Sequence, residues 1–388
     1  MMASGKIRVV RVVSAVNDPM SGTDPRRTAL VAWLTSIAGT EGLHPETLRP
    51  ASIDASFRRY FRLDSDRAGT RIAMDAPPER EDSRQFVKVA RLFGRAGVST
   101  PHIVADDLAR GFLLLTDLGQ TTYLQALEAR ADDGPLYQDA LESLVRIQAA
   151  SCPGELPPYD RGRLLTELRL FPDWYIGRHL RATLAADERA ALEDAFDLLI
   201  ASALAQPAVY VHRDYHSRNL MLLSAGNPGV LDFQDAVLGA PTYDLVSLLR
   251  DAYVEWPEER QINWAVRYWQ GARAAGIPVA EDFAELWRAM EWMGLQRTLK
   301  VLGIFARLFF RDGKDRYLAD LPLVMRHTRS VVERYAAFDG LRRLLDRLDT
   351  LTPSFAPVGA PACAASAATA GKTEDKPGAS PTSSETAD

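Results

Sequence analysis

The stretch VHRDYHSRNLMLLSAGNPGVLDFQDA, at positions 211–236, sets carboxylates, two asparagines and two of the chain's six histidines between short apolar runs. Apolar runs on both sides of a turn such as SAGNPG are typical of a β-hairpin. If Leu223 lies opposite Val230, Asp232 emerges close to Asn219 at the open end of that hairpin. We therefore expect oxygen-bearing side chains to lie close together at one end of the hairpin, next to its buried apolar residues.

These residue types suit one kind of chemistry. Oxygen atoms of Asn219 and Asp232 are ligands that Mg²⁺ prefers, and Mg²⁺ needs few protein ligands when phosphate oxygens complete its shell. Asp214, on the loop that leads into the hairpin, is a further carboxylate that can accept the proton of an attacking hydroxyl. Phosphoryl transfer relies on this combination of positioning and charge neutralisation. Spacing alone therefore predicts a phosphotransferase.

Composition narrows the class of protein further. A chain of 388 residues is long enough for two packed lobes. Its net charge of -5 argues against a nucleic-acid binder. With only Cys152 and Cys363, a disulfide framework and a cysteine-rich zinc site are excluded, and a reducing cytoplasm fits. No apolar run is long enough to cross a bilayer, so we expect no membrane partner.

The predicted secondary structure changes along the chain, from strands and helices to mostly helices. Strand-like runs surround the turn DSDRAGT, the helix SRQFVKVARLFGRAGV follows, and FLLLT is a further buried strand. The remainder is mostly helical. We expect an α+β fold with a flexible arm at 1–24, a small sheet-containing N-lobe at 25–118 and a larger helical C-lobe at 119–352. The Ala-, Pro- and Ser-rich segment 353–388 is predicted to be a disordered tail.

Several motifs resemble those of known kinases. HRDYHSRN fits the H-R-D-x-x-x-x-N catalytic loop of protein kinases, and DFQD stands where those enzymes carry D-F-G. The second histidine and the following PTYDL make the chain similar to the aminoglycoside phosphotransferase-like kinases. RRYFRL, MDAPPER, FLLLTDLG and GLQRTLKVLGIFARL extend the resemblance to the bacterial cell-wall amino sugar kinases.

This resemblance implies a two-lobed protein-kinase-like fold and an enzyme that uses ATP and Mg²⁺. Kinases of this family phosphorylate the anomeric hydroxyl of N-acetylmuramic acid and N-acetylglucosamine, which gives sugar 1-phosphates for peptidoglycan recycling. The expected partners are therefore ATP and a small amino sugar, and we expect a monomer.

The resemblance also implies roles for the motif residues. Asp214 is the expected general base, Asn219 and Asp232 are the expected Mg²⁺ ligands, and His212 is expected to position the catalytic loop by bonding to its backbone. In the PTYDL motif, Asp244 is expected to tie the following helix to that loop.

Two polar residues of the same stretch keep two interpretations each. His216 is either a second support of the loop or a contact to the substrate. Asp235 either forms hydrogen bonds locally or contacts the sugar.

The nucleotide side departs from the kinase pattern. The strand RIAMDAPPER has no lysine to pair with the phosphates, and ASIDASFRRYF lacks the glycines of a Gly-rich loop. Ser56 and the arginines Arg58, Arg59, Arg62 and Arg71 are candidates for phosphate contacts, although solvated strand arginines explain the same pattern. Asp117, in LTDLG, falls where the segment between the lobes presents backbone groups to adenine, and a plain strand end explains it equally well.

Two segments are candidates for the sugar site. Lys300 and Arg307 share one face of a long predicted helix with Gln296, and this positive stripe suits the lactyl carboxylate of N-acetylmuramic acid. A solvated helix face is the alternative. Arg250 and Asp251, in LRDAYVEWPEE, suit a pyranose ring, and ordinary helix packing explains them as well.

Two other functions stay open at this point. An aminoglycoside or other small-molecule phosphotransferase shares the motifs, but aminoglycosides need an acidic pocket. A non-catalytic nucleotide-binding regulator is supported by the missing strand lysine.

Overall fold

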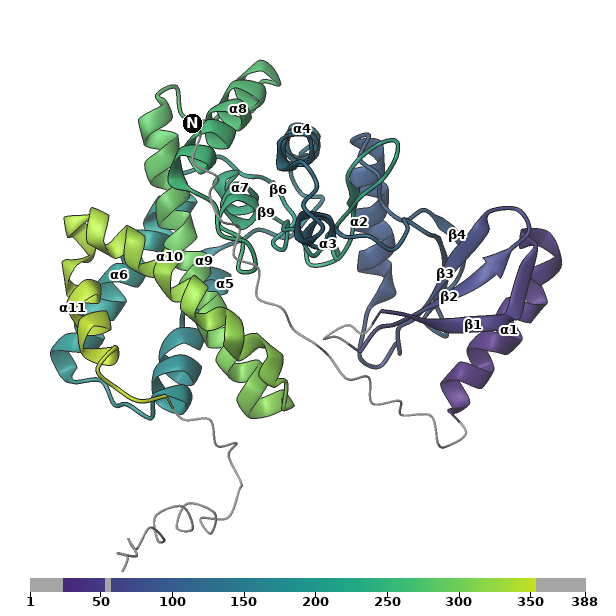
Figure 1. Ribbon diagram of the computed structural model, residues 1–388, viewed down its shortest axis with the longest axis horizontal. Helices are drawn as coiled ribbons and strands as arrows, with labels where there is room; N and C mark the ends of the chain where they lie inside the picture. The colour runs from purple at the N-terminus through teal and green to yellow at the C-terminus, as the bar shows by residue number, and fades with distance from the viewer. Residues whose placement is uncertain (1–23, 53–56, 354–388) are drawn as a thin grey trace, which may run out of the picture. The chain divides into compact units, whose positions relative to one another are not determined.

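The computed structural model describes residues 24–52 and 57–353. In the N-lobe an antiparallel sheet has the strand order β1-β2-β3-β5-β4 (Figure 1). Its strands are β1 (Leu43–Ser52), β2 (Arg59–Ser65), β3 (Gly69–Asp75), β4 (Ile103–Asp107) and β5 (Phe112–Thr116). The strands predicted around DSDRAGT are β2 and β3, and the predicted FLLLT strand is β5, so these predictions are confirmed.

β1 and β4, the two edge strands of this sheet, were not predicted from the sequence. β1 carries Pro45 and Pro50, and its pairing with β2 is interrupted by register shifts. Proline lacks an N–H for the ladder and is tolerated mainly at a sheet edge. β4 is short and mostly half-buried. Neither strand therefore has the apolar alternation that marks a buried strand.

Two helices pack against the sheet region. α1 (Pro25–Glu41) buries Trp33 against Phe112 of β5, and Asp24 caps its first turn. Asp24 thus belongs to the folded lobe, while the rest of the predicted arm lies outside the described residues. α2 (Ser83–Arg95) buries Phe86, whose ring centroid lies 4.9 Å from that of Phe233 in the DFQD motif. The hydrophobic core thereby continues from the N-lobe into the C-lobe.

Helices make up most of the C-lobe, as predicted (Figure 1). They are α3 (Tyr123–Glu128), α4 (Asp133–Ala149), α5 (Arg161–Leu168), the π-helix η1 (Phe171–His179), α6 (Ala186–Leu204), α7 (Thr242–Leu249), α8 (Glu258–Ala274), α9 (Phe283–Asp312), η2 (Asp315–Asp320), α10 (Leu321–Arg334), η3 (Ala336–Phe338) and α11 (Asp339–Leu348). Within the described ranges, no helix combines the length and apolar character needed to cross a membrane. The chain therefore has an α+β fold with a sheet-containing lobe and a larger helical lobe. The tail from 354 onward lies outside the described residues.

Four short strands frame the catalytic motifs. They are β6 (Val209–Val211), β7 (Leu220–Met221), β8 (Gly229–Val230) and β9 (Val237–Gly239), with β6 paired to β9 and β7 to β8. The predicted hairpin is β7–β8, but the predicted register is wrong. Val230 lies opposite Leu220 and not opposite Leu223. The ladder ends early because the N–H of Leu222 turns away to bond the carbonyl of Thr121, at 2.8 Å.

A glycine allows α9 to approach η1 closely. A Cβ atom on Gly303 would lie 2.3 Å from the carbonyl carbon of Leu170, which is far inside contact distance. Leu170 directly precedes η1 and lies two residues beyond the end of α5. This close crossing brings the polar side chains of α9 next to those of α5.

We expect Gly303→Ala to destabilise the fold by about 1–3 kcal/mol, because the added methyl group displaces packed backbone. Urea denaturation measures the free energy of unfolding. Gly271→Ala, in α8, is the matched control, since its Cβ would lie 3.6 Å from Val145 in ordinary contact. That control should be neutral or slightly stabilised, because alanine favours helix. Equal stability of the two variants would contradict the steric argument.

Candidate active site

His212 positions the loop that carries the expected base. Its ring is fully buried, its Nε2–H donates to the carbonyl of Leu231 at 2.8 Å, and its Nδ1 accepts from the backbone N–H of Asp214 at 3.2 Å. Burial lowers the pKa of His212 to about 4, so the ring is neutral at pH 7. These bonds are the ones expected of a support of the loop, and the role of His212 in the reaction stays a prediction.

Asp244 ties α7 to the same loop, as predicted. One of its oxygens accepts the backbone N–H of His212 at 2.6 Å, and the other accepts that of Arg213 at 2.9 Å. Complete burial raises the pKa of Asp244 to about 7. Arg213 has a φ of +80°, a left-handed conformation that is costly for a residue with a side chain. The two bonds from Asp244 hold the backbone at this point.

Asp251 also holds the catalytic loop. Its Oδ2 accepts from the N–H of Ser217 at 3.0 Å and from the hydroxyl of Ser217 at 2.5 Å, and its Oδ1 accepts from the N–H of Tyr253 at 3.1 Å. Its neighbour Arg250 is 4% exposed and forms an ion pair of 2.7 Å with Glu291. Both side chains therefore have protein partners inside the lobe, and contact of either one with a sugar stays a prediction.

Asp214, Asn219 and Asp232 lie together despite the wrong register prediction. The side-chain amide of Asn219 donates to the backbone carbonyl of Asp214 at 3.0 Å and to Oδ2 of Asp232 at 3.4 Å. Gln234 donates to the other carboxylate oxygen of Asp232 at 2.7 Å. Asp232 has a φ of +61°, a second left-handed position at this site. Strained backbone of this kind is concentrated at functional sites.

The donor set suits a hard cation with few protein ligands. The amide nitrogen of Asn219 makes both of the bonds described above, so the carbonyl oxygen of the same side chain is left to serve as a metal ligand next to the carboxylate of Asp232. Over the same described ranges, no group of three or more His, Cys, Asp or Glu is arranged to hold a metal ion. Mg²⁺ fits this limited set, since it keeps several waters and uses phosphate oxygens.

The charge state of Asp214 suits a proton acceptor. Burial alone would raise its pKa, but the positive charges of Lys300, Arg297 and Arg213 lower the pKa of Asp214 to about 2. The carboxylate is therefore ionised at neutral pH. Arg297 is 5% exposed and was not predicted, although it lies next to Gln296 in the quoted helix.

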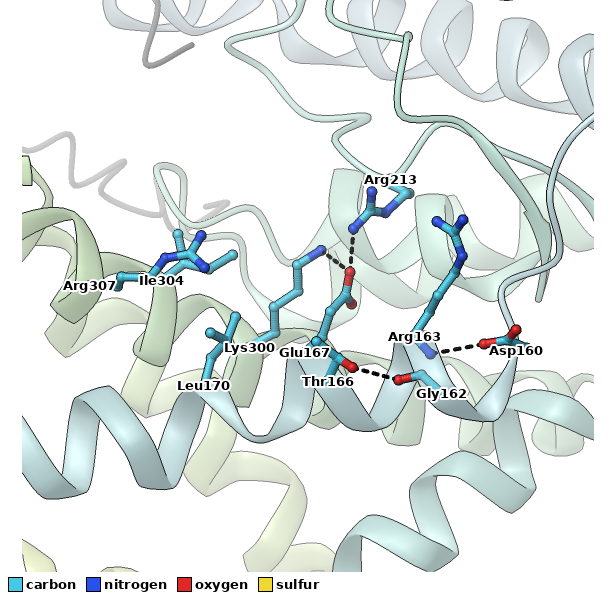
Figure 2. A pocket seen from close by; sticks show the side chains of 10 residues that line it. All are labelled: Asp160, Gly162, Arg163, Thr166, Glu167, Leu170, Arg213, Lys300, Ile304 and Arg307. Carbon is cyan, nitrogen blue, oxygen red and sulfur yellow. Dashed lines mark hydrogen bonds and ion pairs between the residues drawn. The ribbon is translucent and has the colours of Figure 1, made fainter. Parts of the chain in front are cut away.

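A cavity of about 520 Å³ opens beside the catalytic loop (Figure 2). Both stripe residues, Lys300 and Arg307, line it, together with Arg213. The complete lining is Asp160, Gly162, Arg163, Thr166, Glu167, Leu170, Arg213, Lys300, Ile304 and Arg307. Lys300 is 6% exposed, so the alternative of a solvated helix face is wrong for this residue.

Glu167 organises this cavity, and its role is not apparent from the sequence. Its carboxylate lies 3.1 Å from the amine of Lys300 and pairs with the guanidinium of Arg213 (Figure 2). It also accepts a hydrogen bond from the hydroxyl of Tyr159. Although burial opposes the charge, these two cations keep the pKa of Glu167 below its usual value. Lys300 donates in addition to the hydroxyl of Tyr243, in PTYDL, at 3.0 Å.

His216 and Asp235 keep both of their interpretations. His216 is 8% exposed, its ring meets Tyr253 edge-on at 5.5 Å, and its Nδ1 has no hydrogen-bond partner in the described part of the chain. Burial lowers the pKa of His216, so it is neutral at pH 7. Asp235 is exposed to solvent. Contact of either residue with a sugar stays a prediction.

The N-lobe arginines have acidic partners. Arg58 is 8% exposed and forms an ion pair of 2.7 Å with Glu81, so it is not a solvated strand residue. Arg59 pairs with Asp24 and Asp75. Asp75, where a kinase lysine was sought, is fully buried. Ser56 lies outside the described residues. Nucleotide contacts of Ser56, Arg58 and Arg59 stay predictions.

Asp117 fixes the segment that follows β5. It pairs with Arg62 at 3.0 Å and accepts from the hydroxyl of Thr70 at 2.8 Å and from the N–H of Gly119 at 2.9 Å. These bonds lower the pKa of Asp117 against the opposing effect of burial. The carboxylate therefore positions the chain between the lobes, and its proximity to the nucleotide stays a prediction.

Acidification should destabilise the fold through His212. Its pKa is about 4 when folded, against 6.5 for a solvated ring, so the unfolded chain binds more protons between these two values. The free energy of unfolding should therefore fall by roughly 3 kcal/mol as the pH drops through this window. The variant His212→Asn removes the titrating ring. Its side-chain oxygen can still accept the hydrogen bond from the backbone N–H of Asp214.

Urea denaturation across this pH range compares the two proteins. The wild type should lose stability more steeply than His212→Asn. Asp244, whose raised pKa acts in the opposite direction, is present in both proteins. If the free energy of unfolding changed with pH in the same way in both proteins, His212 would not be the group responsible.

Comparison with known proteins agrees with this geometry. Residues 47–292 match the model of the phosphotransferase enzyme family. The N-acetylmuramate/N-acetylglucosamine kinase of Pseudomonas aeruginosa is 49% identical, with 84% of this chain and 97% of that protein covered. The protein of the same name from Neisseria meningitidis serogroup B is 45% identical over 83% of this chain and 96% of its own.

Solved structures agree on the fold. A choline/ethanolamine kinase family protein from Mesorhizobium loti superposes with a TM-score of 0.55 at 17% identity, covering 83% of this chain and 99% of its own. The chain therefore belongs to the phosphotransferase enzyme family, and within it to the family of the N-acetylmuramate/N-acetylglucosamine kinases.

Proposed function

We propose that this chain is an ATP- and Mg²⁺-dependent kinase of the cytoplasm that phosphorylates the anomeric hydroxyl of N-acetylmuramic acid and N-acetylglucosamine. The names of its relatives support the two acceptors. The observation that carries the proposal is the placement of Asp214 next to Asn219 and Asp232, on a loop that is held by the bonds of His212 and Asp244. Peptidoglycan recycling is the process that such products would serve.

In the proposed reaction, the carboxylate of Asp214 accepts the proton of the anomeric hydroxyl. The sugar oxygen forms a bond to the γ-phosphorus of ATP, and the bond from that phosphorus to the bridging oxygen breaks, which releases ADP. Asp214 then returns its proton to solvent. The low pKa of Asp214 keeps it ionised beforehand, and the support from His212 fixes its direction.

Asn219 and Asp232 would hold Mg²⁺, whose contribution when bound is to neutralise charge on the phosphates. Asn219 also fixes the backbone of Asp214 at 3.0 Å, so the residues of the metal site and the base share one rigid unit. On the nucleotide side, the proposal keeps Ser56, Arg58, Arg59 and Asp117 as expected neighbours of ATP.

Charge in the cavity weighs against an aminoglycoside acceptor. Four cationic side chains line it against two carboxylates, and an aminoglycoside brings several ammonium groups of its own. A non-catalytic regulator would not need an ionised base beside two oxygen ligands. The missing strand lysine therefore does not outweigh the geometry of the catalytic loop.

A phosphorylation assay tests the proposed function. The purified chain is incubated with ATP, Mg²⁺ and either amino sugar or kanamycin, and phosphorus NMR identifies the product. A sugar 1-phosphate from the amino sugars is the expected result. Turnover of kanamycin alone would move the acceptor to aminoglycosides, and ATP binding without any turnover would favour the regulator.

A further inference from the structure

We infer that the cavity between α5 and α9 is a subsite for a carboxylate on the acceptor, and that it gives the enzyme a preference for the acidic sugar over the neutral one. This inference rests on the proposed function. One face of the acceptor site would bind the carboxylate of the sugar, while Asp214 on the neighbouring loop acts on the anomeric hydroxyl of the same sugar.

Charge is the first observation. The amine of Lys300 and the guanidinium of Arg213 meet at the buried Glu167, and Arg163 and Arg307 lie on opposite sides of this pair (Figure 2). Asp160 and Glu167 offset two of the four cations, which leaves an excess of two positive charges. A concave site with such an excess attracts an anion.

Hydrogen-bonding capacity is the second observation. The Nε–H groups of Arg213 and Arg307 are buried in the cavity wall without a hydrogen-bond partner in the described chain. Buried donors are costly when they stay unsatisfied, so groups of this kind normally have a partner. Guanidinium groups pair best with planar oxyanions such as carboxylates.

Preorganisation is the third observation. Glu167 accepts hydrogen bonds from Lys300, Arg213 and Tyr159. Because these partners compensate its negative charge, Glu167 repels an anionic ligand only weakly. Instead it holds two cations in the wall, supported by the contact of Lys300 with Tyr243. Fixing side chains before binding reduces the entropy that a ligand must overcome.

Position links the cavity to catalysis. Arg213 lines the cavity and immediately precedes Asp214 in the chain, and the charge of Lys300 acts on Asp214. The volume of about 520 Å³ is in the range of small-molecule sites. N-acetylmuramic acid carries a carboxylate in addition to its anomeric hydroxyl, whereas N-acetylglucosamine has the anomeric hydroxyl but no carboxylate. The cavity thus acts on one of the two acceptors alone.

The test compares kcat/KM for the two sugars in Arg307→Met, which keeps the length of the side chain and removes its charge. We expect the ratio of N-acetylmuramic acid to N-acetylglucosamine to fall by about 10- to 100-fold, the effect of one charged hydrogen bond. Arg163→Met, on the exposed rim, should shift the ratio in the same direction by less. An unchanged ratio in both variants would overturn the inference, as would equal losses on both sugars.

Arg311→Met is the matched control. Arg311 lies one turn further along α9, is 55% exposed and pairs with Asp312 outside the cavity. It should leave both kcat/KM values unchanged. If Arg311→Met lowered the ratio as much as Arg307→Met does, a long-range charge effect would replace the subsite. Circular dichroism on each variant checks that the fold is retained.

Equilibrium binding separates this inference from the proposed function. Calorimetry measures the affinity for N-acetylmuramic acid and for its methyl ester, which lacks the charge. Wild type should bind the acid at least about tenfold more tightly, and Arg307→Met should remove most of that difference. If wild type phosphorylated neither sugar yet still preferred the acid, the proposed function would fail and the subsite would stand. Equal affinities would reject the subsite even in an active kinase.

Discussion

Asp214→Asn is expected to lower kcat by about 10²–10⁴-fold, while binding of ATP and of the amino sugar stays near wild type. The amide has nearly the shape of the carboxylate, but it cannot accept a proton. Its backbone N–H still donates to His212, and its carbonyl still accepts from Asn219, so the loop should keep its conformation. Steady-state kinetics and calorimetry measure turnover and binding separately.

Asp197→Asn is the matched control for this change. Asp197 lies on α6, is 63% exposed and pairs with Arg161 at the surface. Its loss of charge should leave kcat unchanged. Turnover of Asp214→Asn within a few fold of wild type would contradict the assignment of the base. Loss of sugar binding in that variant would instead indicate that the carboxylate mainly positions the acceptor.

The catalytic loop was predictable because its chemistry is local in sequence. Asp214 and Asn219 lie within one loop, and Asp232 follows after a single short hairpin. Even with the register wrong by three residues, both ends of that hairpin stay near each other, because a hairpin always brings its two open ends together. The convergence of the three side chains did not depend on the exact pairing.

The cavity was predictable only in part, because its residues meet through tertiary packing. The helical period placed Lys300 and Arg307 on one face of α9, but it gave no sign of what that face contacts. Glu167 lies 46 residues from Arg213 and 129 from Gln296, both of which donate to it. A single glutamate in a helix has no pattern that distinguishes it from a solvated one.

The same limit applies to two other residues that the sequence suggests for the sugar. Arg250 and Asp251 have the residue types of a sugar site, yet each is bonded to partners inside the lobe. Composition identifies polar groups but does not say whether a protein group or a ligand satisfies them. Burial decides that question, and it is known only from the fold.

Asp232→Asn should lower kcat by about 10²–10³-fold and should raise the Mg²⁺ concentration needed for half-maximal activity. The substitution suits the backbone, since asparagine tolerates the left-handed conformation that Asp232 adopts at a φ of +61°. Its oxygen can still accept from Gln234. The variant therefore removes a negative charge at the expected metal site and little else. Titration of activity with Mg²⁺ measures the effect.

The Mg²⁺ titration also separates the two carboxylates at this site. Asp214→Asn should reduce the maximal rate with an unchanged Mg²⁺ requirement, because the base is not a metal ligand. Asp232→Asn should change both quantities, since weaker attraction of the cation leaves less of the enzyme in its active form. If Asp232→Asn kept the wild-type Mg²⁺ requirement, its carboxylate would be a structural partner of Asn219, and the metal would have to depend on other groups. If Asp214→Asn shifted that requirement instead, the roles of the two residues would be exchanged.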